Sequence, residues 1–163
     1  MVFENKMATR QASTAVVSAS RTWQTNTMIK RVTIHGIDHA RAACEVAMSI
    51  NRQDGFTLEL WSARHGAGSL GPAWFDNIVR IIRSEYPDLN IVGVLDCGDA
   101  AGNALAALRQ GVGCIYVSLK PTVTEKIKAI AGQSNGDVRT RRPKMPDLME
   151  YENPGEMLQA HFS

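Results

Sequence analysis

An apolar strand, a glycine-rich loop and the start of a helix follow one another in residues Thr57 to Pro72, TLELWSARHGAGSLGP. A junction of this kind presents backbone N–H groups at the carboxyl end of a strand, where open α/β sheets bind their ligands. Three further strand-to-helix junctions follow the same logic. They carry Asp38 with His39, Asp96 with Asp99, and Lys120. The sequence therefore predicts one rim at which these side chains meet.

Short apolar runs alternate with amphipathic runs from residue 31 onward. Strands are expected at 32–37, 56–61, 91–95 and 114–119, each followed by apolar residues at helical spacing. Repeated strand–helix units predict right-handed βαβ connections around a parallel sheet. The expected fold is an open three-layer α/β/α sandwich with a mostly parallel sheet of about four to five strands. A half-barrel of βα units that pairs with another copy is the alternative.

Local signals mark the ends of several helices. Pro72 suits the first position of a helix because its missing N–H would be unpaired there, and Gly111 suits the residue that follows one. Asp38 and Asp99 are each expected to cap the helix after them. The helix that begins at Pro72 is expected to bury six apolar residues, which are Trp74, Phe75, Ile78, Val79, Ile81 and Ile82.

The chain divides into three parts by composition. Residues 1–30 are rich in Ser, Thr and Ala, and we expect a flexible arm, although this composition also overlaps with organelle transit peptides. Residues 31–135 are expected to form the α/β domain. Residues 136–163 contain three X-Pro pairs and are expected to form an irregular tail, with a short helix near 156–161. This tail is available to pack on the domain and cover an edge of the sheet.

Composition and charge exclude several classes of function. Hydrophobic residues make up 44% and charged residues 21% of the 163 residues, as in a globular domain. The net charge of +2 is too small to indicate a nucleic-acid or membrane partner, and no apolar run approaches the ~20 residues that span a bilayer. Three widely spaced cysteines form no disulfide framework or zinc pattern. We expect a cytoplasmic protein whose partner is another protein, a second copy of the chain or a small anionic ligand.

The glycine-rich loop is the first candidate for a ligand site. Its glycines spell G-x-G-x-x-G between a strand and a helix, which is the spacing of a dinucleotide-binding loop. The turn before them is long and Pro72 removes one N–H donor, so a plain flexible loop is favoured and nucleotide binding remains an alternative. Cationic side chains beside free N–H groups also suit a phosphate or carboxylate. The ligand-binding candidates here are Ser62, Arg64, His65, Gly66, Gly68 and Gly71.

Asp96 is the second candidate, because it directly follows an apolar strand and should point into the crevice. A buried carboxylate needs a partner, and Lys120 at the end of the next strand is the expected one. The pair is either a structural ion pair or a catalytic pair with Asp96 as base and Lys120 as electrostatic stabiliser. Cys97 in the same loop would be a nucleophile only if its pKa were lowered.

The remaining polar residues carry weaker signals. His35 and His39 have no metal-ligand spacing, so we expect structural histidines and no metal site, and nothing assigns a cofactor. Asp38, His39 and Asp99 stay candidates for ligand binding because they belong to the predicted rim. The short basic run at 139–144 is expected to be a solvated loop.

Three segments carry a resemblance to a known family: RSEYPDLN at 83–90, ALAALRQGV at 104–112 and SLKP at 118–121. With them, the span from Leu58 to Ile130 resembles the later half of response-regulator receiver domains, which have a flavodoxin-like fold. Lys120 matches the family's lysine, whereas Ser62 stands where the phosphoacceptor aspartate would be. The resemblance implies a degenerate receiver that binds a partner without phosphorylation.

Two classes of function are open on the sequence. The first is a receiver-like, non-catalytic module that binds a protein partner or a small anionic ligand at the carboxyl ends of the strands. The second is an enzyme acting on small phosphorylated or carboxylated metabolites, with Asp96, Lys120 and the glycine-rich loop as its site. Nucleotide binding at that loop is a further alternative.

Overall fold

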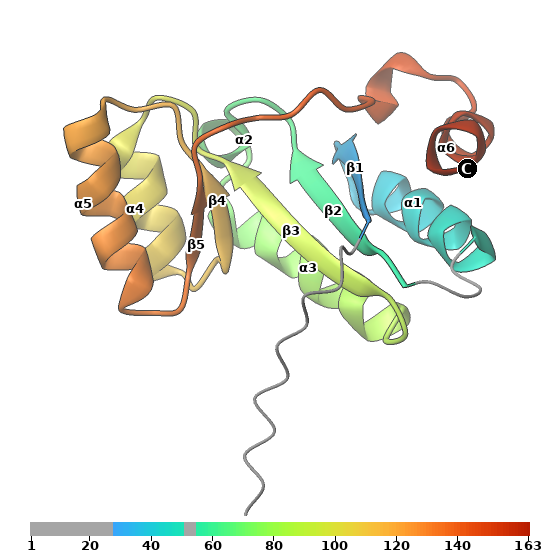
Figure 1. The fold of residues 1–163 in the computed structure, drawn as a ribbon, viewed down its shortest axis with the longest axis horizontal. Helices are drawn as coiled ribbons and strands as arrows, with labels where there is room; N and C mark the ends of the chain where they lie inside the picture. Colours follow the sequence, from blue (N-terminus) through green and yellow to red (C-terminus); the bar gives the residue numbers. More distant parts are fainter. Residues whose placement is uncertain (1–27, 51–54) are drawn as a thin grey trace, which may run out of the picture.

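The computed structural model describes residues 28–50 and 55–163. Five parallel strands form one sheet whose strand order is the order of the chain (Figure 1). The strands are β1 (Ile29–Ile34), β2 (Thr57–Ser62), β3 (Asn90–Asp96), β4 (Cys114–Tyr116) and β5 (Asp137–Arg139). The predicted α/β class with an open, parallel sheet is confirmed. Of the predicted arm, residues 1–27 lie outside the described ranges.

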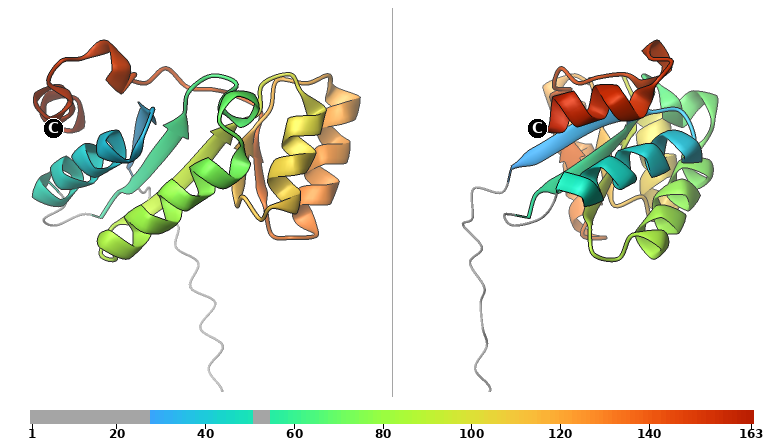
Figure 2. Two further views of the ribbon diagram at one scale, coloured as in Figure 1. Left: turned by 180° about the vertical axis from the view of Figure 1, so that it is seen from behind. Right: turned by 90° about the vertical axis from the view of Figure 1, so that its right-hand side faces the viewer.

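The helices that connect successive strands, α1, α3, α4 and α5, gather on one face of the sheet (Figure 2). Right-handed connections between neighbouring strands require this one-sided arrangement. No helix within 28–50 or 55–163 has the length and apolar character needed to cross a membrane. The helices are α1 (Ile37–Ile50), α2 (Gly66–Ser69), α3 (Pro72–Glu85), α4 (Ala101–Arg109), α5 (Pro121–Gly132), α6 (Pro154–Phe162) and the short 3-10 helix η1 (Leu148–Glu150).

Side chains alternate between the two faces of the sheet, as the pleat of a strand requires. Leu58 and Leu60 of β2 belong to the main core, which the helices cover. Trp61 belongs to a second, smaller cluster on the opposite face, together with Val94 and Cys114. Both faces of β2 are therefore buried, including its polar residues Glu59 and Ser62.

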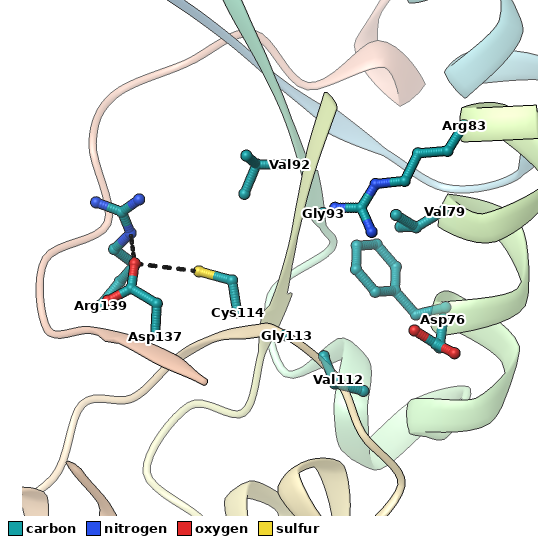
Figure 3. A pocket seen from close by; sticks show the side chains of 11 residues that line it. Asp76, Val79, Arg83, Val92, Gly93, Val112, Gly113, Cys114, Asp137 and Arg139 are labelled. Carbon is teal, nitrogen blue, oxygen red and sulfur yellow. Dashed lines mark hydrogen bonds and ion pairs between the residues drawn. The ribbon is translucent and has the colours of Figure 1, made fainter. Parts of the chain in front are cut away.

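The sheet opens between β3 and β4. These strands pair only at Leu95 with Ile115 and at Asp96 with Tyr116. Where they separate, a cavity of about 300 Å³ forms, lined by α3, β3, β4 and β5 (Figure 3). Beside this cavity, Arg83 of α3 donates two hydrogen bonds to the Ile91 carbonyl oxygen of β3, at 2.9 and 3.1 Å.

The C-terminal segment is more regular than the predicted irregular tail. β5 adds to the sheet beside β4, and the chain then crosses the carboxyl ends of the strands toward β1 (Figure 1). We call residues 140–146 the strap. At the far edge, the Thr33 N–H donates to the Pro146 carbonyl oxygen at 2.8 Å, and Thr33 forms an isolated parallel β-bridge with Asp147. α6, near the predicted short helix, packs on α1, so the tail covers the β1 edge.

Two helix starts differ from the sequence-based prediction, whereas one helix start and one helix end agree with it. α1 already begins at Ile37, so Asp38 lies in its first turn, and α4 begins after Ala100 with no side-chain cap, so Asp99 does not cap it. Both carboxylates still lie near the positive end of a helix dipole. Pro72 is the first residue of α3, and Gly111 follows α4 with φ of 82°.

The helix α3 buries a narrower face than predicted. Phe75, Ile78, Val79 and Ile82 are buried, whereas Trp74 and Ile81 are among the exposed large hydrophobic residues. A helix that packs on only one side buries a stripe of positions three and four apart. The two exposed residues lie beside this stripe, so the prediction that they are core residues was wrong.

Candidate functional site

Asp96 lies at the carboxyl end of β3 and is only 2% exposed. Its Oδ1 accepts hydrogen bonds from the N–H groups of Gly98 at 2.9 Å and His65 at 3.2 Å. Ser62, at the end of β2, is also buried, and its Oγ accepts the Asp96 N–H at 2.9 Å. The structure thus brings three of the candidate residues, Ser62, His65 and Asp96, to the same point of the rim.

The ionic partner of Asp96 is Arg142 of the strap. Arg142 Nη1 donates to Asp96 Oδ2 at 2.6 Å, and its side chain is only 9% exposed. Its Nη2 donates to Thr33 Oγ1 and to the Ser62 carbonyl oxygen, both at 3.1 Å. The guanidinium also lies over the Trp61 ring, 5.3 Å from its centroid. Arg142 is therefore a buried part of the site, and the prediction of a solvated loop was wrong for this residue.

Lys120 does not take the place that the sequence suggested. β4 ends at Tyr116 instead of the expected Leu119, so Lys120 lies beyond the strand, at the N-cap of α5. Its side chain is exposed, and it forms no ion pair within the described part of the chain. The expected Asp96–Lys120 pair is replaced by Asp96–Arg142.

The glycine-rich loop is folded rather than free. The N–H groups of Gly66, Gly68, Ser69 and Leu70 all donate to carbonyl oxygens of Ala63, His65 or Gly66 at 2.9 to 3.3 Å. These donors are consequently occupied and do not form an anion cradle. Gly66 is packed tightly, because a Cβ there would lie 2.7 Å from Ser62 Oγ.

The other two glycines of the motif also have local roles. A Cβ on Gly68 would lie 3.0 Å from Asn103 Nδ2, so this position is close to α4. Gly71 precedes α3 with φ of 82°, a conformation that favours glycine. Close packing and turn geometry therefore account for the G-x-G-x-x-G spacing without a nucleotide.

Two cavities flank Arg64, whose side chain is exposed. The smaller, of about 240 Å³, is lined by His65, Asp96, Asp99, Tyr116 and Ser118. In it, His65 Nδ1 lies 4.0 Å from Asp99 Oδ1. The larger, of about 340 Å³, lies between the strap and the ends of β1 and β2, and we call it the strap cavity. Its polar lining comprises Thr33, His35, Arg64, Arg142, Lys144, Asp147 and Glu150.

The polar residues at the end of β1 have local structural contacts. The His35 ring nitrogen Nε2 pairs with Asp147 Oδ1, and the His35 N–H donates to His39 Nδ1 at 3.3 Å. Burial, with a smaller effect of His35, lowers the pKa of His39. Asp38 is 92% exposed and lies 3.8 Å from Arg41 of its own helix. Within residues 28–50 and 55–163, no group of three or more His, Cys, Asp or Glu side chains could hold a metal ion.

Sequence reasoning missed Glu59, which is buried on the second face of the sheet. Its carboxylate accepts hydrogen bonds from Arg31 Nε at 2.8 Å, Trp61 Nε1 at 3.1 Å and Arg139 Nη2 at 3.4 Å. The signal was present as a lone charge inside the apolar run TLELW. Arg142 gave no comparable signal, because its partner Asp96 is 46 residues away in the chain.

The three cysteines are buried and free. Burial raises the pKa of Cys44 and of Cys97 to about 12, and that of Cys114 to about 11. A nucleophilic cysteine needs the opposite shift, because the thiolate is the reactive form. The geometry around Cys97 therefore speaks against the nucleophile hypothesis.

We expect the native protein to react slowly with iodoacetamide at pH 8 and to label at all three cysteines once it is unfolded. The folded state binds the thiol protons more tightly than the unfolded state, whose thiol pKa is about 8.5. This contribution to stability is therefore present below about pH 8.5 and is lost as the pH rises toward the folded pKa values of about 11 to 12. Mass-spectrometric mapping of the label and melting curves from pH 8 to 11 test both effects. Rapid native labelling of Cys97 would contradict them.

The site can offer positive charge more readily than it can offer a base. Both oxygens of Asp96 accept hydrogen bonds already, whereas Arg64 and Lys144 form no ion pair with any residue in the described ranges. Guanidinium and ammonium groups at a cavity wall suit carboxylates and phosphates. No protein-family model matches the chain, and no curated protein matches it either.

Proposed function

We propose that the protein is a non-catalytic α/β module that binds a small anionic ligand in the strap cavity. The observation that carries this proposal is the presence of Arg64 and Lys144 on the wall of this cavity, each without an ion-pair partner in residues 28–50 and 55–163. They come from opposite sides, Arg64 from the end of β2 and Lys144 from the strap. A ligand between them would connect the strap to the sheet.

The charges around the cavity favour an anion. Burial lowers the pKa of Arg142, and the nearby positive charge of Arg64 adds to this effect. A carboxylate or phosphate next to both guanidinium groups would relieve their repulsion. Of the two acidic side chains in the lining, Asp147 is engaged by His35 and by the Met149 N–H, and Glu150 is exposed.

Binding is favoured over catalysis because the polar groups that a catalytic site would use are already paired or lie apart. Asp96 would have to lose Arg142 before it could act as a base, and Lys120 is not beside it. Four N–H groups of the glycine-rich loop, those of Gly66, Gly68, Ser69 and Leu70, are bonded within the loop and are not free for a substrate or a nucleotide. Free buried cysteines support a reducing, cytoplasmic compartment.

The proposal does not depend on the resemblance to receiver domains. That family belongs to the flavodoxin-like folds with strand order 2-1-3-4-5, whereas the strands here follow the chain order. A receiver-like role in binding a protein partner remains compatible with an anionic ligand, because an acidic segment of a partner presents the same carboxylates.

We expect at least one small anion to raise the melting temperature, in a panel of inorganic phosphate, sugar phosphates, nucleotides, acetyl phosphate and citrate. Arg64→Gln should weaken its binding about tenfold or more, since a hydrogen bond to a charged group contributes about 1.5–3 kcal/mol. Isothermal titration calorimetry measures the change. Arg109→Gln is the matched control, because Arg109 is exposed in the last turn of α4. Equal weakening in both variants, or turnover of any compound in the panel, would contradict the proposal.

A further inference from the structure

The guanidinium of Arg142 lies in a pocket that the sheet builds without the strap. Its acceptors are Thr33 Oγ1 from β1, the Ser62 carbonyl oxygen from β2 and Asp96 Oδ2 from β3. Trp61 of β2 supplies an aromatic face beside them. All four residues are buried and belong to three neighbouring strands. The paired strands therefore hold the acceptors in place whatever fills the pocket.

The strap, in contrast, is attached at few points. Thr140 to Met145 form no backbone–backbone hydrogen bond with any described residue. The strap joins β5 at one end and bonds to β1 through Pro146 at the other. Between these ends, the hydrogen bonds from its side chains to the sheet come from Arg142. Met145 of the strap also packs against the cluster of Trp61, Val94 and Cys114, and Arg142 is the side chain that the strap inserts into the site built by the sheet.

We propose that Thr33, Trp61, Ser62 and Asp96 form a guanidinium-binding site that accepts an arginine side chain or a small guanidinium compound, and that Arg142 is its intramolecular ligand. This inference concerns a ligand of the opposite charge from the anion of the strap cavity and does not depend on that function. Arg142 competes from within the chain at a high effective concentration. An external guanidinium therefore binds well only when Arg142 is absent or withdrawn.

The geometry selects a guanidinium over an ammonium ion. Nη2 donates to two acceptors on different strands, and Nη1 donates to the carboxylate. A single planar group therefore donates all three hydrogen bonds. A flat cation also lies well on the Trp61 ring. An ammonium ion has no plane with which to do this, so Lys is not an equivalent replacement.

The test uses Arg142→Ala in the full-length chain, with methylguanidinium as the probe. We expect a lower melting temperature than in the wild type, and a rise when methylguanidinium is added at about 10 mM, since a ligand that binds only the folded state stabilises it. Methylammonium at the same concentration should leave the melting temperature unchanged. Methylguanidinium should not stabilise the wild type, whose site is filled. Arg142→Lys should melt below the wild type.

A double variant separates this site from a general effect of the salt. In Asp96→Asn/Arg142→Ala the carboxylate is removed, and methylguanidinium should no longer raise the melting temperature. Stabilisation of the double variant to the same extent, equal rescue by methylammonium, or no rescue of Arg142→Ala would each overturn the proposal. If Arg142→Ala does not fold alone, its refolding yield with each cation replaces the melting temperature. Recovery with methylguanidinium alone supports the site, and equal or absent recovery overturns it.

Discussion

Replacing Asp96 with alanine is expected to lower the free energy of unfolding by about 3–5 kcal/mol, because it leaves the buried Arg142 cation without its carboxylate. The same change also removes the acceptor for the N–H groups of His65 and Gly98. Urea denaturation followed by circular dichroism measures the loss. Asp96→Asn keeps an acceptor oxygen and should lose less, so the two variants separate the charge from the hydrogen bonds.

Asp99→Ala is the matched control for this experiment. Asp99 follows in the same loop, but its side chain is 82% exposed and its Oδ1 lies 4.0 Å from the ring nitrogen Nδ1 of His65. Its loss should change the free energy of unfolding by about 0.5 kcal/mol or less. If Asp96→Ala were as mild as Asp99→Ala, the buried ion pair would not be a structural element of the rim.

Gly93→Ala is expected to cost about 1–3 kcal/mol of stability, through overpacking between β3 and α3. A Cβ at this position would lie 2.3 Å from Val79 Cγ2 and 3.0 Å from Cγ1. Val79 is buried on the inner face of α3 but also lines the cavity between β3 and β4, so a shift toward the cavity relieves only part of the clash. Denaturant unfolding measures the loss, and Val79→Ala in the same chain should recover part of it by making room.

Gly102→Ala is the opposite case and serves as its control. Gly102 lies in the first turn of α4. Apart from its chain neighbours and the nearby backbone of the helix, no atom would come within 4 Å of an added Cβ. Alanine should therefore stabilise the protein by about 0.5–1 kcal/mol through helix propensity. A loss of stability in both glycine variants would show that steric contact with Val79 is not the cause of the effect at Gly93.

The sequence allowed the local parts of the fold to be predicted. The alternation of apolar and amphipathic runs located four of the strands, and Pro72 and Gly111 marked helix ends that the structure has at those residues. These signals act over a few residues and depend on backbone geometry alone. β5 was not located, because three residues, DVR, are too short to show a period.

Only part of the candidate site could be predicted, because sequence signals act over a few residues and do not report contacts between distant segments. Asp96 and Ser62 could be placed because each ends an apolar strand, and strand ends of a parallel sheet share one edge. Choosing the partner of Asp96 required knowledge of how the tail returns over the sheet. Lys120 was nearer in sequence, but the path of the strap brings Arg142 to the carboxylate instead. Proximity along the chain was the wrong guide at this point.

The return of the strap to β1 also has a consequence for the order of folding. His35 and Asp147, which meet where the strap ends, are separated by 112 residues. Joining such distant parts of a chain costs more conformational entropy and takes longer than forming the adjacent βα units. We expect the central strands to assemble first and the covering of β1 to come last. Until then the backbone of β1 is open to pairing with another molecule, so aggregation during refolding should begin at this strand.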